Sequence, residues 1–419
     1  MGLEVRQLRR GEEAAFVASV RVPFLDPVTD DPAERRADER WAAEVEADRA
    51  WVAEDHGRFV ANGCNYSLDL TLPAAPGQLA PLVPFAGVSA VGVHPTHRRR
   101  GVLRQLMAHL LEDARSRGEA FAGLLASESV IYGRFGFGHA STCTQLTIDT
   151  QRAAFERPAP ELDLRLVDLH EGAKILPELF DRQRRTRAGE PNRNGHFWDV
   201  YLEDRPARRH GGSGLFLAVC DDGYVAYRVH EEDVMQASYP RVVIEELRGL
   251  TPAVEAGLWR FVLDLDLVGQ VTALRRPVDE SVRWRLADPR QLQVHHVDDR
   301  LYVRILDVPA AFEARGYRRE GRLVFDVKPL PDGDGTPDAA PGRWVLEAGP
   351  DGAACRAARP GEDADLRLGV TELGALYLGG FPPSLVAAAG RVDELRPRSL
   401  IRADELLAVW PAPLTGTGF

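Results

Sequence analysis

Cysteine is scarce in this chain of 419 residues, which contains only four. The four are scattered along the sequence, at Cys64, Cys143, Cys220 and Cys355. Histidines come close together in two places, His94/His97 and His295/His296. Neither residue type stands at the spacing of a metal-ligand motif, so we expect no metal and no disulfide framework. Scattered thiols fit a reducing cytoplasm.

Excess positive charge is also missing, and so are long apolar runs. Lysine and arginine number 52 against 63 acidic residues, which gives a net charge of −11. Nucleic-acid binding needs a basic footprint, so we expect no nucleic-acid partner, whereas an acidic surface attracts small cations. With no N-terminal signal and no apolar run of membrane-spanning length, we expect a cytoplasmic protein without membrane association.

The length of the chain predicts two or three domains. A hydrophobic content of 44% is enough for real cores. A proline-containing stretch at residues 157–160 is a candidate linker. We therefore divide the chain into residues 1–155, 161–303 and 304–419.

The most informative segment is residues 91–104, with the sequence VGVHPTHRRRGVLR. Small and β-branched residues from Gly87 to Val93 predict a strand. An apolar stripe from Leu103 to Ala114 predicts a helix that ends at Gly118, and residues 121–126 read as the next strand. A helix N-terminus carries unpaired amides and partial positive charge, so arginines at its entrance predict a phosphate or pyrophosphate receptor.

Two common phosphate-binding loops are excluded. The segment contains neither Gly-x-x-x-x-Gly-Lys-Ser/Thr nor Gly-x-Gly-x-x-Gly. Residues 98–103 instead resemble the acetyl-CoA loop of the GNAT N-acetyltransferase superfamily, Gln/Arg-x-x-Gly-x-Gly/Ala, with Leu103 in place of the usual small residue. An arginine-rich turn can also be an ordinary solvated surface.

A second block, residues 127–138, follows the next predicted strand. Tyr132, Gly136 and Phe137 match the Tyr-x-x-x-Gly-Phe segment of GNAT enzymes, whose tyrosine protonates the departing CoA thiolate. The chemistry is suitable because a phenol pKa of about 10 is close to a thiol pKa of about 8.5. A packed core aromatic is the alternative interpretation of Tyr132.

The middle part repeats this rhythm. Strands are predicted at residues 215–220, 224–229 and 242–250, followed by a helix from Pro252 to about Leu265 that Thr251 caps. The loop entering this helix lacks the basic run, and Pro252 removes an amide that could bind phosphate. We expect a second GNAT-type fold that is degenerate and structural.

The last part carries predicted helices at residues 308–317, 370–379 and 399–410. This arrangement resembles the sterol-carrier-like domain at the C-terminus of one GNAT subgroup. A lipid or small-ligand carrier, or a non-catalytic scaffold, is therefore an alternative function for the chain.

Over essentially its whole length, the chain resembles the enhanced-intracellular-survival (Eis) type of GNAT acetyltransferase. Arg-Arg-Arg-Gly followed by two aliphatic residues, and the block at residues 126–136, are typical of that subgroup. The resemblance implies an α/β (α+β) fold: a catalytic GNAT domain, a degenerate one and a sterol-carrier-like domain. It also implies acetyl transfer from acetyl-CoA to primary amines, such as lysine side chains, aminoglycosides or polyamines, by a homohexamer.

The resemblance assigns residues to the acetyl-CoA site. Backbone groups of Val91 and Val93, with Gly92 between them, should pair with the pantetheine arm. The pyrophosphate loop comprises Arg99, Arg100, Gly101, Val102, Leu103 and Arg104, and two further residues beside the cofactor are Ser127 and Glu128.

The same resemblance implies that Tyr132 is the general acid and that the terminal carboxylate of Phe419 is the base, in a direct attack without an acyl-enzyme. A glycine-rich tail is otherwise expected to fray. An α-carboxylate pKa of about 3.5 lies roughly 7 units below that of a lysine-like ammonium. The site must therefore raise the carboxylate pKa, lower the amine pKa or relay the proton through water.

The acceptor site is least defined. An acidic segment from Asp26 to Trp41 is suited to a polyamine, with Asp26 and Trp41 as candidate contacts. Its carboxylates are Asp26, Asp30, Asp31, Glu34, Asp38 and Glu39. An ordinary solvated helix or loop is the alternative.

Overall fold

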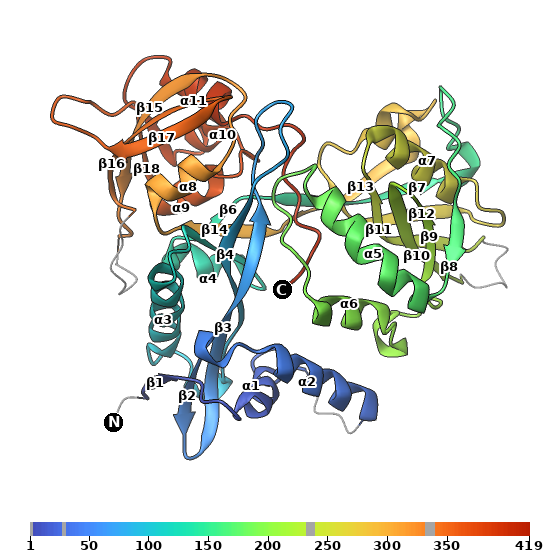
Figure 1. The fold of residues 1–419 in the computed structure, drawn as a ribbon, viewed down its shortest axis with the longest axis horizontal. Coiled ribbons are helices and arrows are strands. Elements are labelled where there is room, and N and C mark those ends of the chain that lie inside the picture. The colour runs from blue at the N-terminus through green and yellow to red at the C-terminus, as the bar shows by residue number, and fades with distance from the viewer. Residues whose placement is uncertain (1–2, 27–30, 232–238, 332–339) are drawn as a thin grey trace. The chain divides into compact units, whose positions relative to one another are not determined.

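The computed structural model describes residues 3–26, 31–231, 239–331 and 340–419. The chain forms two compact units (Figure 1). The first comprises Met1–Ser141, Arg300–Pro413 and Thr417–Phe419. The second comprises Thr142–Asp299 and Leu414–Gly416. In the described ranges, no helix is both long and apolar enough to span a bilayer.

The first unit is built on a sheet in which one pair of neighbouring strands is parallel. Its strands lie in the order β1 (Val5–Gln7), β2 (Ala50–Asp55), β3 (Arg58–Thr71), β4 (Leu82–Val93), β5 (Phe121–Leu125), β14 (Leu301–Ile305) and β6 (Gly138–His139). Strands β4 and β5 are parallel, and their pairing is limited to Ala86–Ala122 and Gly87–Gly123. Because β4 continues to Val93, the two strands separate beyond Gly87.

Helices cover both faces of this sheet (Figure 1). They are α1 (Glu13–Val20), α2 (Pro32–Glu44), α3 (Val102–Ser116) and the short α4 (Ser129–Tyr132). Leu106, Met107 and Leu110 of α3 pack on one face against Ala61 and Val88. On the opposite face, α1 and the partly buried Trp41 of α2 pack around Val52 and Cys64. The predicted strand, helix and strand between residues 87 and 126 are thereby confirmed.

The second unit contains its own mixed sheet. The strand order is β13 (Leu292–Asp299), β7 (Thr142–Asp149), β12 (Gln270–Pro277), β11 (Arg241–Gly249), β10 (Gly223–His230), β9 (Phe216–Cys220) and β8 (Arg165–Val167). Its helices are α5 (Leu169–Arg184), α6 (Gly195–Leu202) and α7 (Pro252–Leu263). Strands β11 and β12 are parallel, and α7 connects them, so the predicted strand–helix–strand rhythm is confirmed.

Two strands pair with partners that are distant in the sequence. Strand β7 follows β6 of the first sheet along the chain but pairs with β12 and β13 of the second sheet. Strand β14 follows the second unit yet pairs with β5 and β6 of the first sheet. The division of the chain into residues 1–155, 161–303 and 304–419 remains a prediction.

The C-terminal part of the first unit forms a third sheet. Its strands lie in the order β17 (Gly352–Ala357), β16 (Gly342–Gly349), β15 (Gly321–Lys328), β18 (Leu366–Gly369) and β19 (Val392–Glu394). The accompanying helices are α8 (Val308–Ala314), α9 (Val370–Leu376), α10 (Pro383–Ala388) and α11 (Ser399–Leu407). Helix α8 ends before the predicted Tyr317 because the extended, buried Arg315 donates to the backbone oxygens of Tyr377 and Leu407.

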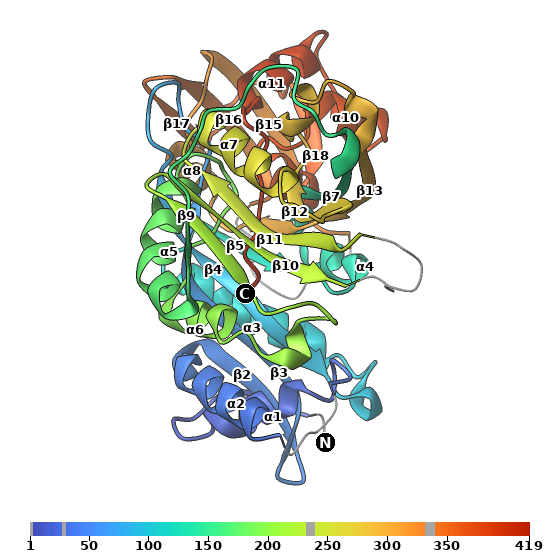
Figure 2. The same ribbon diagram turned by 90° about the vertical axis from the view of Figure 1, so that its right-hand side faces the viewer.

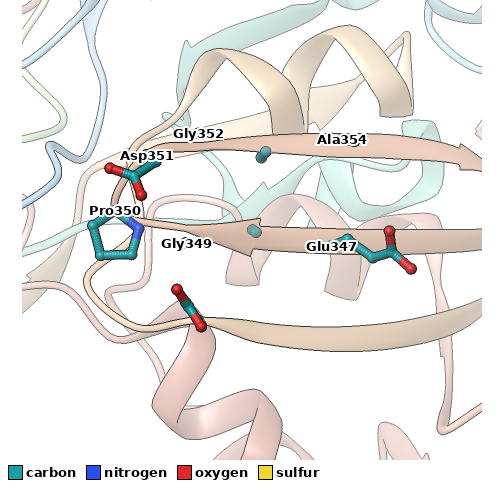
Figure 3. A pocket seen from close by; sticks show the side chains of 9 residues that line it. Glu347, Gly349, Pro350, Asp351, Gly352 and Ala354 are labelled. Carbon is teal, nitrogen blue, oxygen red and sulfur yellow. The ribbon is translucent and has the colours of Figure 1, made fainter.

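Aromatic side chains join this third sheet to the first. The ring of Tyr377 lies 5.3 Å from that of Phe121 and 5.5 Å from that of Phe312. All three belong to one continuous core. An open hollow of about 470 Å³ lies at the β16–β17 turn, with Glu347 and Asp351 among its lining residues (Figure 3). It contains none of the residues that the sequence assigns to the site.

Candidate active site

A basic loop connects β4 to α3. Arg99 and Gly101 have positive φ values of 64° and 79°, which turn the chain sharply into the helix. Arg98, Arg99 and Arg100 are exposed. Gly101 is the N-cap of α3 and, within the described part of the chain, no side chain caps this helix start. The first-turn amides therefore remain available to an anion, which a helix N-terminus favours.

The base of this loop is fixed by polar contacts between side chains. Thr96 Oγ1 lies 2.7 Å from His94 Nδ1 and 2.8 Å from His97 Nδ1. His97 Nε2 lies 3.0 Å from Asp55 Oδ2, and this hydrogen bond lowers the pKa of the Asp55 carboxyl. Among the described residues, no three His, Cys, Asp or Glu side chains form a metal-binding group.

Strand β4 carries a bulge just before the loop. The register with β3 shifts between Asn62 and Cys64, where Ala90 adopts a φ of 52°. The Asn62 side chain donates to the Ala90 carbonyl and so holds the bulge. A bulge re-aims the backbone of its strand. It precedes Val91 and Val93, whose backbone the sequence assigns to the pantetheine arm.

Gly92, between these valines, lies against the turn after α1. A Cβ on Gly92 would be 2.6 Å from the Pro23 side chain, so this position requires glycine. Asp26 follows that turn, is exposed, and donates its amide to the Arg21 carbonyl at 2.9 Å. The structure thus brings the segment before Asp26 beside β4.

Tyr132 is the last residue of α4 and is buried. Its ring meets that of Phe137 edge to face, with centroids 6.3 Å apart. Burial raises the pKa of the Tyr132 phenol, and the carboxylate of Glu128 raises it further. The turn after it needs Gly136, which has a φ of 75° and where any Cβ would overlap the Arg304 guanidinium. Ser127 and Glu128 are exposed at the start of α4.

The end of the chain returns to the first sheet, beside β4 and β5 (Figure 2). A Cβ on Gly87 would lie 3.1 Å from Cδ2 of Phe419, so the terminal ring occupies the space over that glycine. The ring also lies edge-on to Phe85, at 5.9 Å between centroids. Gly87 forms the last pair before β4 and β5 separate. Phe419 therefore lies where the parallel strands diverge.

Tyr66 lies near the point where β4 and β5 separate, and no motif in the sequence identified it. It lies opposite Gly87 in the β3–β4 register, and its hydroxyl accepts a 2.6 Å hydrogen bond from Trp41 Nε1. Burial raises the pKa of the Tyr66 phenol. A tyrosine on a half-buried strand carries no local signal of function. The pairing of β3 with β4 places it opposite Gly87, and the packing of α2 brings Trp41 to it.

The acidic segment is partly engaged in internal contacts. Asp31 caps α2 by accepting from the amide of Ala33 at 2.9 Å. Arg21 pairs with Asp38 at 2.7 Å and lies 3.9 Å from Glu34. Much of the negative charge therefore serves the packing of α2. Three carboxylates of the segment remain: Asp26 and Glu39 are exposed, and Asp30 lies outside the described residues.

In the second unit, the helix start that corresponds to that of α3 is the start of α7, and it is capped. Thr251 Oγ1 accepts from the amide of Val254 at 3.2 Å and so caps α7, with Pro252 at its first position. Where β11 and β12 separate, Arg276 of β12 donates to the Leu247 carbonyl of β11 at 2.7 Å. Arg248, at the end of β11, is buried. Among the described residues of this junction, no arginine corresponds to the exposed run of the first unit's loop.

Family models match all three parts of the chain. An acetyltransferase (GNAT) domain matches residues 4–140, and a second one of the same description matches residues 189–305. A sterol carrier protein domain matches residues 308–414. The fold and the domain order thus define a GNAT N-acetyltransferase with two tandem GNAT domains and a sterol-carrier-like domain. The fold class expected from sequence is confirmed.

Similar proteins narrow this class. The chain is 35% identical to an uncharacterized N-acetyltransferase of Streptomyces coelicolor, over 100% of both chains. It is 35% identical to the N-acetyltransferase Eis of Mycobacterium bovis, over 88% of this chain and 89% of that protein. The crystal structure of Eis1 from Mycobacterium abscessus superposes with a TM-score of 0.84 and 28% identity, covering 99% of this chain and 100% of that one. The chain belongs to the Eis family of N-acetyltransferases.

Proposed function

We propose that this N-acetyltransferase transfers the acetyl group of acetyl-CoA to primary amines, with aminoglycosides, polyamines and lysine side chains as acceptor classes. One observation carries the proposal. Within the first unit, the buried Tyr132 and the chain-terminal Phe419 belong to the same sheet-and-helix assembly as the uncapped start of α3.

The residues of the first unit fit acetyl-CoA. A pyrophosphate would lie at the amides from Gly101 to Arg104, with the exposed arginines before them. A Cβ at Gly101 would have no described atom within 4 Å, which leaves room for a ligand to approach the backbone. The pantetheine arm would run along β4 after the bulge, where Val91 and Val93 are half-buried and β5 has separated. We also propose Ser127 and Glu128 beside the cofactor.

The proposed chemistry needs one acid and one base. The amine nitrogen attacks the thioester carbonyl, the carbon–sulfur bond breaks, and Tyr132 donates its proton to the departing sulfur. The amine proton passes to the Phe419 carboxylate. Burial keeps the Tyr132 phenol protonated, because its pKa is raised. For the base to work, the site must raise the carboxylate pKa, lower the amine pKa or relay the proton through water.

The acceptor proposal rests on charge and on aromatic surface. Asp26 is exposed beside the turn that packs on Gly92, and Trp41 faces Tyr66 near Phe419. Acidic and aromatic groups together suit a cationic amine. In the C-terminal part, Phe312 packs against Phe325 and Tyr377 within a continuous core. We favour acetyl transfer over the alternative of a lipid or small-ligand carrier.

The proposal also covers the oligomeric state and the cellular compartment. We propose a homohexamer, which sedimentation equilibrium would test by its mass. We also propose a reducing, cytoplasmic site of action, which agrees with the four free cysteines.

The experiment is a thiol-release assay. Purified protein is mixed with acetyl-CoA and, in separate reactions, an aminoglycoside, a polyamine or a lysine-containing peptide. We expect free CoA and an acceptor heavier by one acetyl group in at least one reaction. Release of CoA no faster than hydrolysis without acceptor, for every amine class, would contradict the proposed function.

A further inference from the structure

The bulge in β4 lies directly before the backbone that we assign to the pantetheine arm. Between the pairs Asn62–Gly92 and Cys64–Ser89, strand β3 has one residue and β4 has two. Such an extra residue disrupts the regular ladder of backbone hydrogen bonds. Ala90, the first of the two, adopts a φ of 52°, a left-handed conformation that costs a residue with a Cβ roughly 1–2 kcal/mol. The bulge therefore needs contacts that hold it.

Side chains of β3 supply such contacts. Asn62 Nδ2 donates to the Ala90 carbonyl, and Cys64 Sγ donates to the Ser89 carbonyl at 3.7 Å. Asn62 is 1% exposed, and its Oδ1 accepts from Ser19 Oγ of α1 at 3.4 Å. A thiol is a weak donor, whereas an amide N–H that donates to a carbonyl forms a full hydrogen bond. The Asn62 contact is therefore the stronger of the two.

The orientation of the Ala90 carbonyl also sets that of the next amide. A peptide bond is planar and trans, so the N–H of Val91 points opposite to the C=O of Ala90. Because Asn62 holds that carbonyl, the Val91 N–H is directed away from the Asn62 side chain. Strand β5 has already left β4 at this level, since their pairing ends at Gly87. All of these residues lie within the first unit.

We propose that Asn62 is a positioning residue for acetyl-CoA: by holding the Ala90 carbonyl, it aims the Val91 amide at the pantetheine arm. This inference rests on the proposed function, which places the arm along this part of β4 and the pyrophosphate at the start of α3. Asn62 thus acts on the arm of the cofactor and not on its nucleotide end.

The test compares two ligands in the full-length protein. Acetyl-CoA carries the pantetheine arm, whereas adenosine 3′,5′-bisphosphate contains the nucleotide but lacks the arm. Both Kd values are measured by isothermal titration calorimetry. We expect Asn62→Ala and Asn62→Asp to raise the Kd for acetyl-CoA by about two- to tenfold, the factor that corresponds to one lost hydrogen bond. The Kd for the bisphosphate should stay that of the parent protein.

A matched control is Asn65→Ala. Asn65 is a second buried asparagine of β3, but its Nδ2 donates to the Leu110 carbonyl at 2.8 Å and to Asp113 Oδ2 at 2.9 Å rather than to the bulge. We expect this variant to lower the melting temperature without changing the ratio of the two Kd values. The control separates a loss of stability from a loss of positioning.

A further variant relieves the strain at Ala90. Glycine adopts a positive φ without the penalty of a Cβ, so Ala90→Gly makes the bulge conformation accessible when Asn62 is absent. We expect the double variant Asn62→Ala/Ala90→Gly to bind acetyl-CoA more tightly than Asn62→Ala does. A purely structural role of Asn62 predicts no such recovery, because Ala90→Gly removes a buried methyl group and lowers stability further.

Three results would overturn the proposal. They are an unchanged Kd for acetyl-CoA in the Asn62 variants, an equal loss of affinity for both ligands, and no recovery in the double variant. The proposed function is tested separately, because the parent protein either does or does not acetylate amines, whereas the role of Asn62 is measured by binding.

Discussion

The ring of Phe419, the last residue of the chain, packs edge-on against Phe85 in β4, with centroids 5.9 Å apart. Edge-to-face pairs of this kind add roughly 0.5–1.5 kcal/mol beyond the burial of their surface. A tail with the sequence TGTGF would be expected to fray. The Phe419 ring instead lies over Gly87, near the point where β4 and β5 separate.

Removal of the Tyr132 hydroxyl should slow the chemical step. We expect Tyr132→Phe to lower kcat by about 10²–10⁴-fold, the usual contribution of a general acid. The ring stays in place against Phe137, so KM for acetyl-CoA and the melting temperature should remain those of the parent. Phe135→Tyr adds a hydroxyl to the same buried cluster and serves as a control for polarity. Full activity in Tyr132→Phe would exclude it as the acid.

The pH profile should show no downturn from Tyr132 in the neutral range. A raised pKa means that the phenol stays protonated to higher pH than its ordinary value of about 10. The acid form is therefore present throughout pH 6–9, while the rate rises with pH as the acceptor ammonium loses its proton. The measurement is kcat/KM against pH. A falling limb below about pH 9 that disappears in Tyr132→Phe would contradict this assignment.

The two helix starts should respond differently to substitution. Gly101→Ala places an alanine at a φ of 79°, at a cost of roughly 1–2 kcal/mol, so we expect a several-fold higher KM for acetyl-CoA. Thr251→Ala removes the cap of α7 and should lower the free energy of unfolding by about 1 kcal/mol while KM stays unchanged. The contrast fails if Thr251→Ala raises KM as much as Gly101→Ala does.

Tyr66 should influence the acceptor rather than the donor. Tyr66→Phe removes the oxygen that accepts from Trp41 Nε1, which frees the indole to shift. We expect KM for the amine to rise several-fold while KM for acetyl-CoA is unaffected. Steady-state kinetics with each substrate varied in turn distinguishes the two. Equal changes in both constants would show that the residue acts through general packing of the sheet.

Local patterns in the sequence were sufficient for much of this structure. The strand before the basic loop, the helix after it and the cap at Thr251 all follow from short-range propensities and periodicity. Gly101 and Gly136 were singled out by motif, and both adopt a positive φ.

Long-range pairing was not accessible in this way. Strand β7 lies in the second sheet and β14 in the first because each pairs with strands more than one hundred residues away, as in the pair Val303–Gly123. The placement of Tyr66 opposite Gly87 has the same origin. Local propensity carries no information about which distant residue will lie opposite a given one, so these features required the structure.

The central claim is that the free carboxylate of Phe419 acts as the base. Extending the chain by one glycine converts that carboxylate into an amide while leaving the Phe419 ring in place over Gly87. We predict that kcat of the extended protein falls about hundredfold or more, the scale of a lost general base, with an unchanged Kd for acetyl-CoA. A kcat equal to that of the parent protein would contradict the account.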